Sequence, residues 1–71
     1  MSEKLLAKVY EFIKQYTDYV GVAPTLREIA EGCHISLGSV LDALSLLESR
    51  GWIEREEGEG SLIKIPSRAA D

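Results

Sequence analysis

The chain has 71 residues, 45% of them hydrophobic, and a formal net charge of −4 at pH 7. This length allows one small domain with a single core, and no apolar run approaches the roughly 18 residues of a membrane span. The acidic balance counts against indiscriminate nucleic-acid binding, which depends mainly on Lys and Arg neutralising phosphates. The net charge does not say how the charged residues are distributed over any one face of the folded domain.

A single cysteine, Cys33, allows no internal disulfide, which fits a reducing cytoplasm. Residues 1–10 lack the basic start and long apolar middle of a secretory signal. We therefore expect a cytoplasmic protein without a membrane partner. One Cys and one His are too few for a structural zinc site, which needs four ligands, so we expect no metal and no cofactor.

Residues 3–20 have the spacing of an amphipathic helix, because apolar residues recur at three- and four-residue steps between charged ones. Ser2 is typical of a helix start and Gly21 of a helix stop. Pro24 disfavours helical geometry in the residue before it, so we expect a short strand or an extended link around Val22. The apolar positions are Leu5, Leu6, Val9, Phe12, Ile13, Tyr16 and Val20.

A second helix is predicted to begin after Thr25. Thr25 and Glu28, three residues apart, have the pattern of a capping box, in which each side chain binds the other residue's backbone N–H. The expected buried face consists of Leu26, Ile29 and Ala30. Residues 31–36 break the helix, with Cys33 as a small core residue and His34 in the turn.

Ser36 is a suitable N-cap for a third helix that Gly51 would end in a left-handed conformation. Apolar residues gather on one side of this helix and polar residues on the other. The expected core residues are Val40, Ala43, Leu44 and Leu47. The expected outer residues are Ser39, Asp42, Ser45 and Ser49.

The remaining sequence predicts a β-hairpin. We predict strands at residues 52–56 and 62–65, with the glycine-rich segment 57–60 as the tip between them. Pro66 would end the second strand. Trp52 and the three tyrosines stand at positions that suit packing.

This order of elements predicts a mainly α fold with a small β-hairpin, namely a winged helix-turn-helix. Such a domain has three helices and a two- or three-stranded antiparallel wing. We expect residues 1–66 to form the domain and residues 67–71 a frayed tail.

Two stretches of the sequence resemble the N-terminal DNA-binding domain of LexA-type repressors. They are "EFIKQYTDYVGVAPTLREIAE", followed by the pattern "S..SV...L..LESRGWIER" that begins at Ser36. The segment "PTLREIAE" is the most specific part, and the likeness covers roughly residues 9–65. His34 stands where the family commonly has glycine, and His is among the residues over-represented in left-handed backbone.

The resemblance implies that the third helix enters the DNA major groove, while the start of the second helix and the wing contact the backbone. Such modules usually act as dimers on half-sites about one helical turn of DNA apart. The family's usual partner domain is a self-cleaving Ser/Lys protease. Whether this sequence is a lone domain or a fragment stays open.

The candidate DNA-binding residues follow from this arrangement. A phosphate at the start of the second helix would meet free backbone N–H groups and the helix dipole, with Arg27 adding charge. Serine hydroxyls can bond several base edges, and an aspartate can accept from a cytosine amino group. The candidates are Thr25 and Arg27 for phosphate, Ser36, Gly38, Ser39, Asp42 and Ser45 for bases, and Arg55 and Lys64 on the wing.

The alternative interpretation is that the domain does not bind DNA: it is an acidic winged helix that binds a protein partner through the third helix or the wing, or it is itself a DNA mimic. Glutamates outnumber cations on the predicted wing, and Leu41 and Leu46 could form an apolar contact patch. Catalysis is not expected, since the single His has no nucleophile and carboxylate evident around it and no phosphate-binding glycine loop is present.

Overall fold

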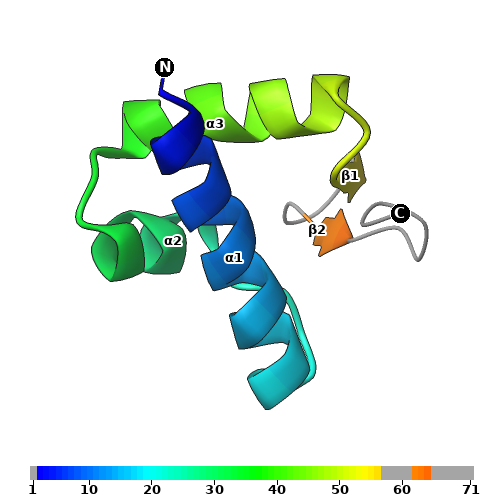
Figure 1. Cartoon of the computed structure of the whole chain (residues 1–71). Helices are drawn as coiled ribbons and strands as arrows, with labels where there is room; N and C mark the ends of the chain where they lie inside the picture. Colours follow the sequence, from blue (N-terminus) through cyan, green and yellow to red (C-terminus); the bar gives the residue numbers. More distant parts are fainter. Residues whose placement is uncertain (1, 57–61, 65–71) are drawn as a thin grey trace.

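The computed structural model describes residues 2–56 and 62–64, which form three helices and a two-stranded hairpin (Figure 1). Helix α3 lies across one end of α1, α2 packs beside α1, and the hairpin follows the end of α3. The winged helix-turn-helix architecture predicted from the sequence is confirmed. The elements are α1 (Glu3–Val20), α2 (Leu26–Cys33), α3 (Leu37–Ser49), β1 (Glu54–Glu56) and β2 (Leu62–Lys64).

Each helix begins after a hydroxyl side chain in extended backbone. Ser2, Thr25 and Ser36 each accept a hydrogen bond from the backbone N–H three residues further on, at 3.1 Å in all three cases. These bonds satisfy N–H groups that have no partner within the helix itself. All three predicted helix starts are confirmed.

The turn between α2 and α3 depends on left-handed backbone at His34, with φ 58° and ψ 45°. The His34 N–H donates to the Glu31 carbonyl at 3.3 Å, and the Ile35 N–H donates to the Ala30 carbonyl at 3.0 Å. This pair of bonds is a Schellman motif, which satisfies carbonyls at the end of a helix. The predicted role of His34 as a turn residue is confirmed.

Gly51, with φ 77°, ends α3 in the same way and occupies the left-handed position predicted for it. It follows Arg50, which keeps right-handed helical backbone. The Trp52 N–H reaches back to the Leu47 carbonyl at 2.9 Å. Glycine suits this position because it has no Cβ to oppose a positive φ.

One core lies between the helices and under the hairpin, and apolar residues of the three helices, of β2 and of the segment before β1 contribute to it. Full burial of a Leu, Ile or Val side chain stabilises a fold by about 1.5–3 kcal/mol relative to exposure. The four core residues predicted for α3 are all buried. The buried set is Leu6, Val9, Tyr10, Ile13, Ile29, Cys33, Val40, Ala43, Leu44, Leu47, Ile53 and Ile63.

The hairpin is antiparallel, and its register pairs Glu54 with Lys64, Arg55 with Ile63, and Glu56 with Leu62. The first strand is shorter than predicted, since β1 begins at Glu54, after Trp52 and Ile53. The predicted tip at 57–60, the strand end at Ile65, Pro66 and the tail at 67–71 lie outside the described residues.

The first half of the chain decides one open alternative and corrects one expectation. Residues 21–25 form a link with no strand, as the second of the two alternatives for the region around Val22 has it, and the described sheet has two strands; Pro24 is buried there and has no N–H to donate to a ladder. Tyr19 does not pack: it is 93% exposed, because it lies on the outer side of the last turn of α1. Tyr10 does pack, with its ring edge-on to Trp52 at a centroid distance of 5.1 Å.

Leu46 also departs from the expectation of an exposed leucine. It is half-buried and packs against the core, whereas Leu41 remains 40% exposed. The two leucines therefore face different surroundings and do not form one patch. The exposed apolar neighbour of Leu41 on α3 is instead Leu37, which is 50% exposed.

Gly32 provides a test of the α1–α2 packing. A Cβ at this position would lie 2.3 Å from Cε1 of the half-buried Phe12 ring, so the ring would have to move. Gly38 in α3 is the matched control, since a Cβ there would meet nothing closer than the Ser36 Oγ at 4.0 Å. Both replacements by alanine gain a similar helix propensity.

We predict that Gly32→Ala is less stable than Gly38→Ala by about 1–3 kcal/mol, the usual cost of overpacking. Chemical denaturation followed by circular dichroism measures the difference. Equal stability of the two variants would show that the Phe12 ring does not restrict α2.

Candidate nucleic-acid interface

The start of α2 is organised by a complete capping box. The Thr25 Oγ accepts from the Glu28 N–H at 3.1 Å, and the Thr25 N–H donates to the Glu28 carboxylate at 2.8 Å. The Thr25 hydroxyl can still donate its own hydrogen outward, since a hydroxyl is both donor and acceptor. Within the described residues, the N–H groups of Leu26 and Arg27 have no bond to the protein.

The Glu28 carboxylate is also bound from the other side, by α1. The Tyr16 hydroxyl donates to its second oxygen at 2.7 Å. The Thr25 N–H, followed by the Tyr16 hydroxyl, holds the pKa of Glu28 below its ordinary value, and the same bond raises the pKa of Tyr16. Glu28 therefore presents a charge already engaged by the protein at the helix end where an anion would approach.

Arg27 lies exposed in the first turn of α2, one residue from the capping box. Two free N–H groups, the positive end of the helix dipole and a guanidinium are thus placed together on one helix end. This combination suits a phosphate oxygen. Thr25 and Arg27, both predicted as phosphate contacts, share this helix end.

The first turn of α3 joins two of the predicted base-contacting serines. The Ser36 hydroxyl donates to the Ser39 Oγ at 3.0 Å and accepts from the Ser39 N–H at 3.1 Å. Ser39 is half-buried, whereas Ser36 is exposed. The Ser39 hydroxyl keeps its own hydrogen free for an acceptor outside the domain.

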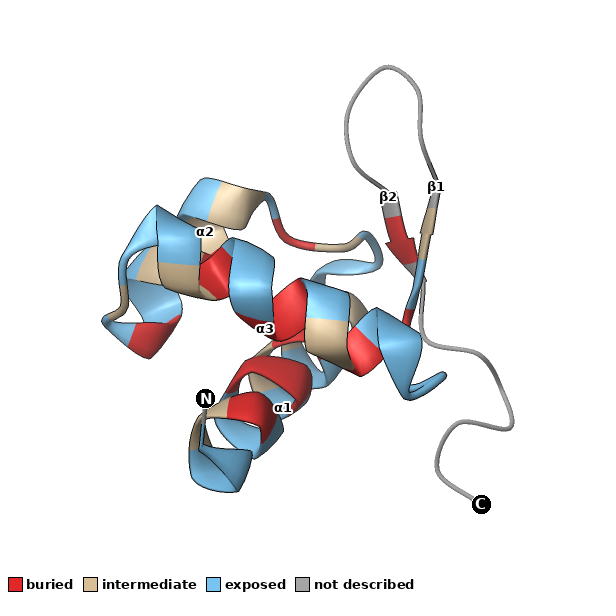
Figure 2. Cartoon of the chain, turned by 90° about the horizontal axis from the view of Figure 1, so that it is seen from above, coloured by how far each residue is buried: buried red, intermediate tan, exposed pale blue. Residues whose placement is uncertain are grey.

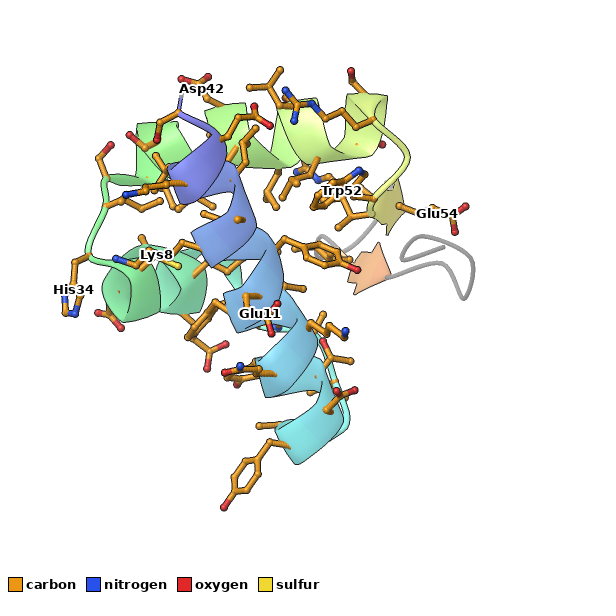
Figure 3. All side chains as sticks on the ribbon, viewed as in Figure 1. Lys8, Glu11, His34, Asp42, Trp52 and Glu54 are labelled. Atoms are coloured by element: carbon orange, nitrogen blue, oxygen red, sulfur yellow. The ribbon has the colours of Figure 1, made fainter. Side chains whose placement is uncertain are left out.

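The outer face of α3 carries the other predicted base contacts. Gly38, Asp42 and Ser45 are exposed, and Figure 3 places Asp42 on the side of α3 that points away from the body of the domain. Seen from above in Figure 2, exposed positions run along α3 beside the buried ones. Leu37 and Leu41 lie among these polar residues, so the face is mixed in character.

The cation at the end of α3 is paired, which the sequence did not predict. The Arg50 guanidinium donates to both oxygens of Glu3, at 2.8 Å each, and so joins the end of α3 to the start of α1. Hydrogen bonding to Arg50 lowers the pKa of Glu3, and the same bond raises the pKa of Arg50. The residues are 47 positions apart, and no short-range pattern indicates their meeting.

The wing places its charged residues on two sides. Cross-strand partners share a face, so Arg55 lies on the side of the buried Ile63, where it is half-buried. Glu54 is exposed and points away from the domain in Figure 3. The register sets Lys64 opposite Glu54, and the Lys64 side chain lies outside the described part of the chain.

The described residues contain neither a candidate metal site nor a candidate membrane-spanning helix. No group of three or more His, Cys, Asp or Glu side chains in residues 2–56 and 62–64 could hold a metal ion. Within those ranges no helix is both long and apolar enough to cross a membrane. Cys33 is buried, and burial raises the pKa of its thiol.

Two helices joined by a tight turn, the second with an exposed mixed face, and a following hairpin define a winged helix-turn-helix of the DNA-binding type. The family model for the LexA DNA binding domain matches residues 4–60. The chain belongs to this family of DNA-binding domains.

Relatives of known name agree with the family. The chain is 38% identical to the LexA repressor of Clostridium novyi over 65 residues, which are 90% of this chain and 32% of the relative. It is 34% identical to that of Carboxydothermus hydrogenoformans over 64 residues, 89% of this chain and 31% of the relative. For Staphylococcus epidermidis the identity is 32% over 69 residues, 96% and 34% of the two chains. The chain thus spans about a third of the length of these relatives.

The Glu28 capping box predicts an acid-dependent loss of stability. A carboxyl group whose pKa is lowered in the folded state stabilises the fold at pH above its ordinary value of 4.5. That contribution is lost as the pH falls through the lowered pKa. Glu28→Gln keeps a side-chain oxygen for the Thr25 N–H but has no charge to lose.

We therefore expect the melting temperature of the parent domain to fall more steeply below pH 4.5 than that of Glu28→Gln. Thermal melts between pH 7 and pH 3 measure both profiles. Glu31→Gln, which removes an exposed carboxylate from the same helix, controls for the loss of one charge. Parallel profiles for the parent and Glu28→Gln would show that the capping carboxylate is not linked to folding.

Proposed function

We propose that this domain binds double-stranded DNA in a sequence-specific manner and acts as a repressor-like regulator of transcription. Helix α3 lies in the major groove, and the start of α2 holds the sugar-phosphate backbone beside it. The domain acts in the cytoplasm by binding, not by catalysis. The family match over residues 4–60 and the LexA repressors among its relatives support this proposal.

The observation that carries the proposal is the α2 end, with its unbonded N–H groups and the exposed Arg27. A helix N-terminus of this kind attracts phosphate, and the Tyr16–Glu28 hydrogen bond ties the capping box to α1. The contact needs few cations, because backbone N–H groups and the helix dipole supply part of the positive potential. This explains how a domain of net charge −4 can present an anion-binding end.

Bases are read by the outer face of α3. The Ser39 hydroxyl has a free hydrogen for a base acceptor, and Asp42 can accept from a cytosine amino group. Gly38 lets the helix backbone approach the base edges closely, since it carries no side chain. Ser36, the N-cap of α3, and Ser45 are exposed before and after these residues, and Arg55 and Lys64 of the wing are candidates for the neighbouring backbone.

One observation favours the alternative of an acidic protein-binding module. Asp42 and Glu48 are exposed on α3, and Arg50 is engaged by Glu3, so this helix offers no unpaired cation. A basic partner could meet such a face. The two functions differ in their response to salt and DNA, which the following measurement uses.

We predict that Arg27→Ala weakens binding to all DNA sequences alike, by roughly tenfold at low salt, because it removes one charged phosphate contact. The slope of log affinity against log salt concentration should fall by about 1. Arg50→Ala is the matched control, since it removes the same charge from an arginine that is already paired. Ser39→Ala should instead change the preference among sequences.

Fluorescence anisotropy with mixed-sequence and selected duplexes, at several salt concentrations, measures these effects. Equal losses for Arg27→Ala and Arg50→Ala would show that the α2 end is not the phosphate site. A parent domain without affinity for any duplex at low salt, where phosphate contacts are strongest, would favour the protein-binding module.

A further inference from the structure

Two leucines lie exposed on the face of α3 that the proposed function turns toward DNA. Leu37 is 50% exposed and Leu41 is 40% exposed, and they are one helical turn apart. Residues four apart in a helix lie on the same side, one above the other. They form a short apolar strip, which we call the leucine strip, beside Gly38 and Asp42.

Internal packing gives no reason for glycine at position 38, next to the leucine strip. A Cβ there would meet nothing closer than the Ser36 Oγ at 4.0 Å, and its φ is not positive. Glycine inside a helix costs about 1 kcal/mol relative to alanine. The open space beside the leucines therefore favours close approach by a partner over any need of the fold.

The chemistry of α3 limits which base edges it can read. Residues 37–49 contain no Lys or Arg, so α3 has no side chain for the usual bidentate contact to guanine. Leucine can neither donate nor accept a hydrogen bond. The apolar group that the bases expose in the major groove is the C5 methyl of thymine.

We infer that Leu37 and Leu41 select the DNA site by contacting thymine methyl groups. This inference rests on the proposed function and names the bases that α3 reads. Four residues of helix advance by about 6 Å, and base pairs are stacked about 3.4 Å apart. The two thymines therefore lie within about two base pairs of each other in one half-site.

The test begins with a duplex selected from a randomised pool by the parent domain. Each thymine is then replaced in turn by deoxyuridine, which removes the C5 methyl and keeps every hydrogen-bonding group. At two nearby positions, the parent should bind the uracil duplex about fourfold more weakly, the factor expected for one methyl group withdrawn from water.

Two variants assign the effect to the leucines. Leu41→Ala should bind the thymine and uracil duplexes equally at one of these positions, and Leu37→Ala at the other, while each keeps the fourfold loss at its partner position. Val22→Ala is the control: it shortens an apolar side chain that is 63% exposed on the link before α2, and it should keep both losses. Circular dichroism verifies that each variant is folded.

The possible results separate this inference from the function on which it rests. Specific binding that is indifferent to every uracil substitution overturns the leucine contact alone. The leucine contact is also overturned if Leu41→Ala and Leu37→Ala both keep the full loss of affinity on replacing thymine by uracil. A parent domain that selects no duplex overturns the proposed function as well, and would leave the leucine strip as a surface for protein contact.

Discussion

The left-handed turn at His34 sets the angle between α2 and α3, and the exposed face depends on that angle. Cys33 is buried before the turn and Ile35 packs against the core after it, so both sides of His34 are anchored. A left-handed conformation costs a residue with a Cβ roughly 1–2 kcal/mol, which the two bonds of the Schellman motif offset. We propose that, with this turn in place, the N-terminal end of α2 and the outer face of α3 form one DNA-binding surface.

On the proposed surface, α2 and α3 have different roles: α2 attracts phosphate and α3 contacts the bases. The end of α2 supplies positive potential from N–H groups and Arg27, while α3 presents hydroxyls, carboxylates and the leucine strip. In the proposed function, attraction to phosphate and discrimination among bases are thus carried by different residues. A domain of negative net charge can work in this way if its affinity is modest and its contacts are concentrated.

Local features of the fold could be predicted from the sequence because their causes are local. The hydroxyls of Ser2, Thr25 and Ser36, the capping glutamate three residues after Thr25, and the glycine at position 51 each act within one helical turn. The apolar spacing of α3 identified its whole buried side for the same reason. A periodic pattern determines the inner face of a helix without knowledge of its neighbour.

Contacts between distant residues could not be predicted in this way. The bond from Tyr16 to Glu28 and the ion pair of Glu3 with Arg50 depend on how the helices cross, and spacing along one helix carries no such information. The expectation that Tyr19 packs was wrong because Tyr19 lies near the end of α1 and is exposed to solvent, which its spacing along the helix does not reveal. The sequence therefore predicted which residues make up the candidate site. The hydrogen bonds and ion pairs among them could be identified only from the structure.

The most direct test of the central claim, that the α2 end and the outer face of α3 form one DNA-binding surface, is a titration of isotope-labelled domain with a mixed-sequence duplex. Backbone amide shifts are followed at low and then moderate salt. We predict shifts clustered at residues 25–28 and 36–45 that fade as salt rises, since phosphate contacts weaken with counterion concentration. Shifts absent at low salt, or gathered instead around the exposed end of α1 near Tyr19, would contradict the assignment.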